Sequence, residues 1–299
     1  MDSLSAILNT FRLEAEIIQS AQYCGDWAIK TSGQGHVTFH FVTQGCCYLD
    51  ADCFDAPLLM NAGDFILFSR DANHKLESSP ECGVPVNSVK SLSYTEGLQL
   101  ESVGLLCGYF CFSHAASNPL LQSLPEYIYY QAGSSENGAA IQGLLDVIKA
   151  EVIENGSGHT IVINRLTESL FALLLRAYIN RAREASLATG LAAALADSRI
   201  SRALDAIHNN PETNWSVHEL AEIATMSRSA FADRFKVLLQ EPPKTYLSRW
   251  RMQNAWIWLK EEGATTIDVA NRCGYESEAA FSKAFKKVTG QTPGSVRNQ

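Results

Sequence analysis

Apolar residues change their spacing along the chain. Between residues 36 and 112, short runs alternate apolar and polar side chains and are separated by Gly, Asn, Asp and Pro. The clearest runs are HVTFHFV (36–42), CCYLDA (46–51), DFILFS (64–69) and LLCGYFCF (105–112). Alternation with a period of two indicates β-strands that bury one face. Many short strands with frequent turns predict a small barrel or sandwich.

From about residue 136 the apolar residues fall three and four positions apart, which is the period of an amphipathic helix. Two such segments, 139–155 and 160–182, are separated by the turn sequence NGSGH. Residues 184–196 are small and weakly patterned, which predicts a linker. The pattern beyond residue 196 predicts helices only.

The C-terminal third contains the same helical unit twice. A shift of 50 residues places AFADRFK (230–236) on AFSKAFK (280–286). In each copy two Phe residues four positions apart lie on one helix face and leave the opposite face polar. A short capped helix, a tight turn and a second helix with a free polar face is the plan of a helix-turn-helix motif. The spacing alone is equally compatible with two helical hairpins of an all-α domain.

Charge is distributed unevenly between the two parts of the chain. Residues 196–299 hold 14 Lys and Arg against 12 Asp and Glu, a net charge of +2, and residues 1–195 hold 10 against 20, a net charge of −10. This difference indicates separate roles, with the C-terminal part better suited to phosphates. The sequence predicts neither a secretory signal nor a membrane span, since the longest apolar stretch is short and contains Arg176. We therefore expect a cytoplasmic protein.

Residues 199–297 resemble the DNA-binding domain of AraC/XylS transcription regulators. The matching stretches are LAEIATMSRSAFADRFK, the helix after PP, and IDVANRCGYESEAAFSKAFKKVTGQTPGSVR. The resemblance implies that two motifs flank one long helix, and that each recognition helix enters a major groove of double-stranded DNA.

The resemblance also implies which side chains meet DNA. The base-reading positions would be Ser229, Ala232, Asp233, Ala279 and Lys283. Lys283 can donate to guanine, and Asp233 can accept from cytosine N4. Many relatives carry Arg at the position of Asp233, so the alternative is that Asp233 only pairs with Arg234. Contacts to phosphate, or plain surface charge, are expected of Arg228, Arg249, Arg251, Lys286 and Lys287.

Residues 37–130 resemble the cupin-like N-terminal domain of one AraC branch, through FHFVTQGCCYL, NAGDFILFSRDANHKL, LLCGYFCF and NPLLQSLPEYI. His40, His74 and Cys107 match residues of that pattern. Three interpretations stay open: a transition-metal site, a buried histidine pair without a ligand, and a site for a small molecule or an oxidant. No His-x-His pair or nearby Glu completes the usual metal set, so we expect no metal and no cofactor.

The same region resembles regulators that respond to reactive chlorine or other electrophiles through thiols. Cys24 stands near one of their cysteines and Cys107 matches the second. A thiolate held by a nearby His or cation would be oxidised first, whereas an apolar strand position more commonly holds Cys as a small core residue. Cys46 and Cys47 are expected on opposite faces of a strand, which makes them a poor disulfide pair.

These observations predict an α+β multidomain protein. A cupin-like sensor barrel is expected over residues 1–133, a helical dimerisation and linker segment over 134–195, and an AraC-type double helix-turn-helix domain over 196–299. The predicted function is that of a DNA-binding transcription regulator, expected to be an activator, which binds promoter or operator DNA as a homodimer, contacts RNA polymerase and senses a small effector or an oxidant. The alternative is a metal-dependent cupin enzyme with an accessory helical domain. No nucleophile–base set and no phosphate loop is recognisable, so we expect neither catalytic residues nor enzymatic activity.

Overall fold

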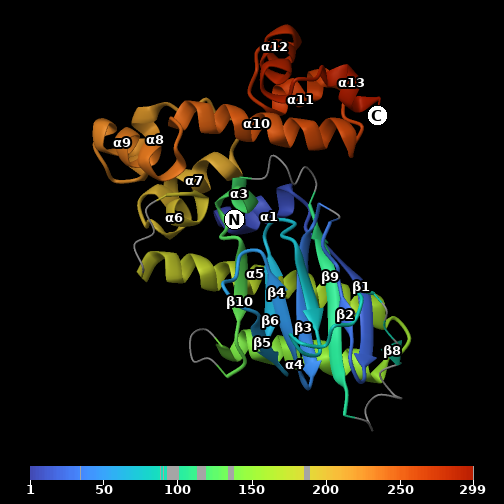
Figure 1. Ribbon diagram of the computed structural model, residues 1–299. Helices are drawn as coiled ribbons and strands as arrows, with labels where there is room; N and C mark the ends of the chain where they lie inside the picture. The colour runs from blue at the N-terminus through green and yellow to red at the C-terminus, as the bar shows by residue number, and fades with distance from the viewer. Residues whose placement is uncertain are drawn as a thin grey trace. The chain divides into compact units, whose positions relative to one another are not determined.

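The computed structural model describes residues 1–33, 35–87, 89, 91–92, 101–112, 119–133, 138–184 and 189–298 (Figure 1). The chain divides into two compact units. Unit 1 consists of Met1–Arg12, Ser113–Ser123 and Ile179–Gln299, and unit 2 consists of Leu13–Phe112 and Leu124–Tyr178. The first twelve residues thus belong with the C-terminal third. Residues 134–137, the expected junction of barrel and helices, lie outside the described residues.

Unit 2 is built on two antiparallel sheets. The first contains, in spatial order, β10 (Tyr127–Tyr130), β6 (Phe65–Phe68), β3 (Val37–Gln44), β9 (Val103–Cys111), β1 (Glu14–Tyr23) and β8 (Ser91–Leu92). The second contains β2 (Ala28–Ile29), β7 (His74–Glu77), β4 (Cys46–Ala51) and β5 (Leu58–Asn61). The four runs with clear alternation are β3, β4, β6 and β9, so those strand predictions are confirmed.

The core of unit 2 lies between the two sheets. A cluster of buried residues joins apolar side chains from both, among them Val42, Leu49, Phe68, Leu76 and Leu105. The outer face of the first sheet is covered by the helices α4 (Gly138–Glu154) and α5 (His159–Glu184), which run beside it in Figure 1. The rings of Phe110 and Phe171 pack there with centroids 4.7 Å apart. Strand β3 is buried on both faces because it has the core on one side and α5 on the other.

Unit 1 is helical. The described residues form α1 (Ser3–Thr10), α3 (Pro119–Ser123), α6 (Leu191–Ala196), α7 (Ile200–Asn209), α8 (Val217–Ile223), α9 (Arg228–Leu239), α10 (Pro243–Lys260), α11 (Thr266–Arg272), α12 (Glu278–Thr289) and α13 (Pro293–Arg297). Helix α1 is fixed to α7, because the backbone N–H and the hydroxyl of Ser3 donate to the Asp205 carboxylate at 2.7 and 2.6 Å.

One sequence expectation needs correction in this unit. Residues 191–196 were expected in a linker, but they form α6, in which all six residues are buried. Helix α6 packs against α7 and α9. Because all of its residues are buried, its sequence lacks the alternation of apolar and polar positions by which an amphipathic helix is recognised. Residues 185–188, the earlier part of the expected linker, lie outside the described residues.

Helix α10 connects two similar helical groups (Figure 1). The α8–α9 pair lies at one end of α10, and α11, α12 and α13 lie at the other. Helices α9 and α12 are each followed by a helix that begins with Pro, at Pro243 and Pro293. The 18 residues of α10 span about 27 Å at 1.5 Å per residue. None of the helices in the described part of the chain combines the length and apolar character needed to cross a bilayer.

Candidate nucleic-acid interface and sensor site

Side-chain caps determine where the helices of each motif begin. Ser216 and Glu219 form a complete capping box at the start of α8. The hydroxyl of Ser227 accepts from the backbone N–H of Ala230 at 3.3 Å, and the hydroxyl of Ser277 accepts from that of Ala280 at 3.2 Å. Each cap satisfies a backbone donor that the helix itself leaves unpaired. The two recognition helices, α9 and α12, therefore start at equivalent positions.

The turn between the two helices is also the same in both motifs. The backbone N–H of Met226 donates to the carbonyl of Ala221 at 2.9 Å, and the N–H of Tyr275 donates to the carbonyl of Ala270 at 2.9 Å. This is the 6→1 hydrogen bond of a Schellman motif, which requires a residue with positive φ just before the donor. Thr225 (φ 55°) and Gly274 (φ 69°) occupy that position.

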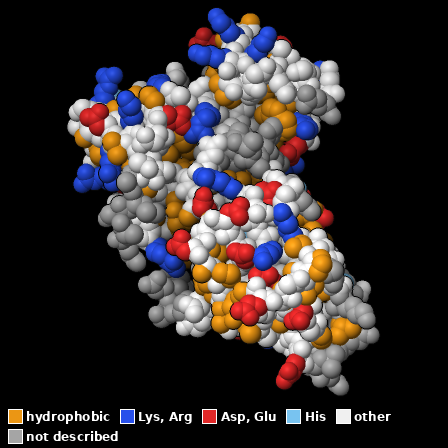
Figure 2. Space-filling view, in the orientation of Figure 1, with side chains coloured by type: hydrophobic (Ala, Val, Ile, Leu, Met, Phe, Trp, Pro, Cys, Tyr) orange, Lys and Arg blue, Asp and Glu red, His pale blue; other side chains and the backbone are white. Residues whose placement is uncertain are grey.

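The two Phe pairs orient the recognition helices. Phe231, Phe235, Phe281 and Phe285 are all fully buried. Since residues four apart share a helix face, the opposite face of each helix must point to solvent. On that side Arg228, Ser229, Asp233, Ala279, Lys283, Lys286 and Lys287 are exposed, and Ala232 is half-buried. Figure 2 shows Lys and Arg side chains on the surface around both motifs, with some Asp and Glu among them.

Two arginines expected at phosphate or surface positions are engaged within the protein. Arg249 forms an ion pair with Glu241 and lies 5.2 Å over the ring of Tyr246. Arg251 is buried and donates to three backbone carbonyls, those of Pro211, Glu212 and Thr213. Nothing in the sequence distinguishes Arg251 from a surface Arg, because the carbonyls that it binds lie about 40 residues earlier in the chain.

Arg251 joins the two motifs. The segment 211–213 precedes the first motif, and Gly274 in the second motif packs directly against it. A Cβ on Gly274 would lie 2.1 Å from the carbonyl oxygen of Glu212 and 3.2 Å from Nη2 of Arg251. The guanidinium also lies 6.0 Å from the centroid of the Tyr275 ring. A single buried guanidinium therefore connects the entry to the first motif with the turn of the second.

Arg234, the alternative partner named for Asp233, is paired with another carboxylate in the described part of the chain. Arg234 Nε donates instead to Asp197 Oδ2 at 3.0 Å. Two backbone N–H groups, of Arg199 and Ile200, donate to the same carboxyl, and these contacts hold the pKa of Asp197 below its usual value against the opposing effect of burial. Arg234 thus attaches α9 to the start of α7.

The histidines and the cysteine singled out in the barrel meet inside unit 2. Strand register pairs His40 with Cys107, and His74 reaches His40 from the second sheet. His40 Nδ1 lies 3.0 Å from Cys107 Sγ, and the two Nε2 atoms of His40 and His74 are 2.7 Å apart. Thr31 Oγ1 lies 3.0 Å from His74 Nε2 and 3.3 Å from His40 Nε2. All four side chains are buried. Thr31 was not identified from the sequence, where it precedes the first recognisable strand.

Burial keeps this group uncharged. It lowers the pKa of His40 well below its usual value, and the neighbouring His74 adds to the effect. Burial likewise lowers the pKa of His74 and raises that of the Cys107 thiol. At neutral pH both imidazoles are therefore neutral and the sulfur is a thiol.

The distances then determine one direction of hydrogen bonding. His74 Nδ1 lies 2.7 Å from the carbonyl oxygen of Ala72, so it donates, and Nε2 of the same ring must accept. His40 Nε2 donates to it, which leaves His40 Nδ1 to accept from the thiol of Cys107. The result is a continuous chain of hydrogen bonds from Cys107 through both histidines to the backbone.

The arrangement does not converge on a metal position. A tetrahedral zinc ion bound at about 2.0–2.1 Å by two imidazoles would hold their nitrogens about 3.3 Å apart, and the sulfur would bind the same ion. Here Cys107 contacts His40 Nδ1, whereas His74 lies against His40 Nε2 on the other side of the ring. The sulfur and the two facing nitrogens therefore do not surround one point. Within the described residues, no group of three or more His, Cys, Asp and Glu side chains is arranged to hold a metal ion.

Cys24 is distant from this group. It follows the last residue of β1, Tyr23, which pairs with Val103 four residues from Cys107 on β9. Four strand residues correspond to about 13 Å, well beyond the roughly 4.4–6.8 Å between the Cα atoms of a disulfide. Cys46 is exposed and Cys47 is buried, so the prediction that they face opposite sides of their strand is confirmed.

Comparison with known proteins agrees with this architecture. Residues 2–180 match the Cupin family and residues 220–299 match a helix-turn-helix domain family. The chain is 32% identical over 301 residues to a putative AraC-like transcription regulator of Streptomyces lividans, with 99% of this chain and 98% of that protein covered. It is 26% identical over 303 residues to the RCS-specific HTH-type transcriptional activator RclR of Escherichia coli strain K12, with 100% and 98% covered.

A similar solved structure is that of the DNA-binding domain of AdpA in complex with a target DNA. The sequence identity is 31%, the match covers 31% of this chain and 83% of the AdpA chain, and the TM-score is 0.30. The names of the full-length relatives describe transcription regulators rather than cupin enzymes. The repeated motifs, the cupin match and the full-length similarity together show that the chain belongs to the AraC-like transcription regulators, as a DNA-binding regulator with an N-terminal cupin domain.

Proposed function

We propose that α9 and α12 read two neighbouring major-groove segments of one operator. The supporting observation is the repeated frame, in which buried Phe pairs turn a polar helix face outward at each end of α10. The length of α10, about 27 Å, is close to the roughly 34 Å between successive major grooves on one side of B-DNA.

Within this proposal, individual side chains have different roles. Lys283 is exposed on the second recognition helix and donates to guanine O6 or N7. Ser229, Ala232, Asp233 and Ala279 lie at the other base-facing positions. Arg228, Lys286 and Lys287 contact phosphates and supply affinity without sequence information.

The helices α4 and α5 carry the proposed homodimer contact. Three large apolar side chains on the described residues of these helices are exposed, with 51% of Val147, 62% of Ile161 and 40% of Val162 accessible to solvent. Apolar side chains that a monomer leaves in water favour association with a second copy. In the dimer, two readers bind a repeated site and raise transcription through contact with RNA polymerase.

The proposed sensor is the buried hydrogen-bonded chain of Cys107, His40 and His74. A small uncharged oxidant such as hypochlorous acid can react with a thiol without a charged group entering the core. Sulfur attacks chlorine, the Cl–O bond breaks, and an S–Cl bond forms. The thiol proton passes by way of His40 Nδ1 to the departing hydroxide, which leaves as water. Sulfur is thereby oxidised and chlorine reduced. The relative described as RCS-specific supports this choice of oxidant.

Operator selection tests the DNA-reading proposal. The purified full-length protein is incubated with a random duplex library, and binding to the enriched sequence is measured at several salt concentrations. We expect a bipartite enriched site and an affinity that falls steeply with salt, because phosphate contacts release counterions. Failure to enrich any sequence, with salt-independent binding, would contradict the proposal.

A matched pair of cysteine variants tests the sensor. Cys107→Ser should abolish the change in operator affinity after hypochlorous acid treatment and leave affinity without oxidant intact, because the reading helices belong to unit 1. Cys46→Ser removes an exposed thiol and should respond like the wild type. An unchanged response in Cys107→Ser would rule out the oxidant, and binding of small uncharged molecules near His40 would then be examined.

A further inference from the structure

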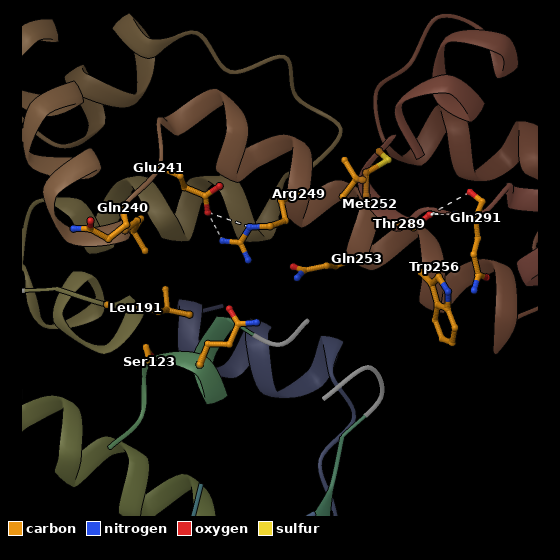
Figure 3. Close-up of a pocket in the computed structure, with 14 residues that line it drawn as sticks. Ser123, Leu191, Gln240, Glu241, Arg249, Met252, Gln253, Trp256, Thr289 and Gln291 are labelled. Atoms are coloured by element: carbon orange, nitrogen blue, oxygen red, sulfur yellow. Dashed lines mark hydrogen bonds and ion pairs between the residues drawn. The ribbon is translucent and has the colours of Figure 1, made fainter. Parts of the chain in front are cut away.

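A groove in unit 1 lies apart from the polar faces of the recognition helices and from the interior of the barrel. Its volume is about 790 Å³, and the described residues that line it all belong to unit 1. One face of α10 forms its floor, with Arg249, Met252, Gln253 and Trp256 at positions i, i+3, i+4 and i+7 (Figure 3). This face explains why α10 carries several polar residues between the two motif cores.

The walls of the groove come from both motifs. Leu239, Gln240 and Glu241, at and just after the C-terminal end of α9, form one wall. Val288 and Thr289 at the end of α12, with Gln291, form the opposite wall. Ser123 of α3 and Leu191 of α6 close the groove from the side facing α10, as Figure 3 shows. An occupant would therefore touch the ends of both recognition helices at once.

The chemistry of the lining indicates the class of occupant. Arg249 and Glu241 are the charged residues among those that line the groove, and they neutralise each other in an ion pair whose Nε–Oε1 distance is 3.0 Å. The other polar groups are amides and hydroxyls. Trp256 contributes a flat ring, with Lys260 Nζ 4.7 Å from its centroid, and the half-buried Leu239 and the exposed Val288 add apolar surface. Such a lining suits an uncharged molecule with an aromatic body and a few hydrogen-bonding groups.

The size of the groove agrees with that class. Small-molecule sites typically measure about 300–1,000 Å³ and combine apolar surface with a few placed polar groups. We infer that this groove binds an uncharged aromatic small molecule, and that the bound molecule, which contacts the ends of both α9 and α12, changes operator affinity. The second part of the inference rests on the proposed function, in which these two helices read DNA.

Fluorescence of N-phenyl-1-naphthylamine, an uncharged aromatic dye that brightens in apolar sites, tests the site in the full-length protein. We expect saturable 1:1 binding to the wild type. Val288→Trp fills the groove from α12 and should weaken dye binding at least tenfold. Gln122→Trp fills it from α3 and should do the same. Both positions are exposed enough to accept a larger side chain without disturbing the core.

Val237→Trp is the matched control. Val237 is exposed to 51% on α9, close to the 45% of Val288, but does not line the groove. Dye affinity in this variant should equal that of the wild type. Absence of dye binding to the wild type, or equal affinity in all four proteins, would overturn the site.

Operator DNA tests the coupling. Because coupling between two sites is reciprocal, saturating operator should change the dye affinity by the same factor by which the dye changes operator affinity. We expect a change of at least threefold in the wild type. Dye affinity that operator leaves unaltered would overturn the coupling. A protein that binds dye in this groove but no duplex DNA would instead contradict the proposed function, and a protein that binds operator but no dye would contradict the site.

Discussion

The turns of the two helix-turn-helix motifs have the same hydrogen bond but different residues at the position with positive φ. The first motif has Thr225 there and the second has Gly274. A left-handed φ alone therefore does not require Gly in this frame. Gly274 is required by its neighbours, since the carbonyl oxygen of Glu212 and the guanidinium of Arg251 occupy the space of a Cβ. Both turns therefore require a residue with positive φ, but only the second turn lacks the space for a Cβ at that residue.

The recognition helices differ in their charged side chains as well. On α9, Arg234 is bound to Asp197, which ties that helix to the body of unit 1. On α12, Lys283, Lys286 and Lys287 are all exposed. The second motif consequently offers more free positive charge to a phosphate backbone, and the first is fixed more firmly to its surroundings.

Removing one Phe from each motif tests whether the shared frame contributes equally to both. Phe235→Ala and Phe285→Ala should each lower the free energy of unfolding by about 3–5 kcal/mol, because both rings are fully buried. Urea unfolding followed by circular dichroism measures the loss. Val237→Ala, an exposed position, serves as the control and should change stability by less than about 0.5 kcal/mol. A loss below about 1 kcal/mol in either Phe variant would show that its motif does not depend on the pair.

Substitution of each turn residue distinguishes the requirement for positive φ from the requirement for space at the Cβ position. Gly274→Ala should cost about 2–3 kcal/mol, since the new methyl group meets the backbone at Glu212 in addition to the strained φ. Thr225→Gly keeps the φ and should change stability by less than about 1 kcal/mol. Thermal unfolding of the two variants beside the wild type gives both values. A cost of only about 1 kcal/mol in Gly274→Ala, which the left-handed φ alone accounts for, would mean that the contact with Glu212 does not make Gly274 necessary.

Substituting the charged residues on the exposed faces compares the motifs as readers. Lys283→Ala should weaken binding to the enriched operator by about 1–3 kcal/mol and relax selectivity at a few base pairs. Lys287→Ala should weaken binding to all sequences alike. Asp233→Ala should relax selectivity at one cytosine if its carboxylate reads that base. Uniform tightening on all duplexes would instead identify Asp233 as a solvated charge that repels phosphate. Competition binding with single-position operator variants distinguishes these results.

Mild acid should weaken the first motif selectively. His208 is buried against Trp250, its Nε2 lies 2.7 Å from the hydroxyl of Tyr246, and burial together with Arg249 lowers its pKa to about 3. The unfolded chain binds this proton near pH 6.5, so the stability contributed by neutral His208 is complete above that pH and declines as pH falls toward 3. Between pH 7 and 5.5 the wild type should lose about 1 kcal/mol more stability than His208→Asn. Residues 266–297 contain no histidine, so α11 and α12 have no equivalent. Parallel pH profiles for the two proteins would contradict this assignment.

The parts of the fold that could be predicted are those in which local pattern and tertiary burial agree. The runs that form β3 and β9 are short, rich in apolar residues and largely buried, and the helices after residue 136 keep one apolar face. Strand β1 was not predicted because Ile17 and Ile18 are adjacent, and the register shifts at this point as in a β-bulge. The attachment of α1 to α7 could not be predicted, since it depends on the contact of Ser3 with Asp205, 202 residues away.

The candidate sites show the same division. The resemblance to cupin-like domains singled out His40 and His74, but only the arrangement of the two sheets brings them together. The repeat predicted the exposed face of α12, including Lys283. It could not predict that Arg251 would be buried, because the carbonyls that bind it come from a loop about 40 residues earlier in the chain.

If α9 and α12 read DNA as proposed, the contacts of Arg251 have a consequence for the design of promoters. A buried side chain that holds the entry of one motif to the turn of the other leaves the two readers no hinge, so their spacing is a constant of the protein. Inserting one base pair between the two subsites of an operator would rotate them by about 34–36° about the DNA axis. A reader without a hinge cannot follow that rotation. Natural operators for a single chain should therefore vary in base sequence but not in the number of base pairs between the subsites, and insertions should be tolerated only between sites bound by different chains.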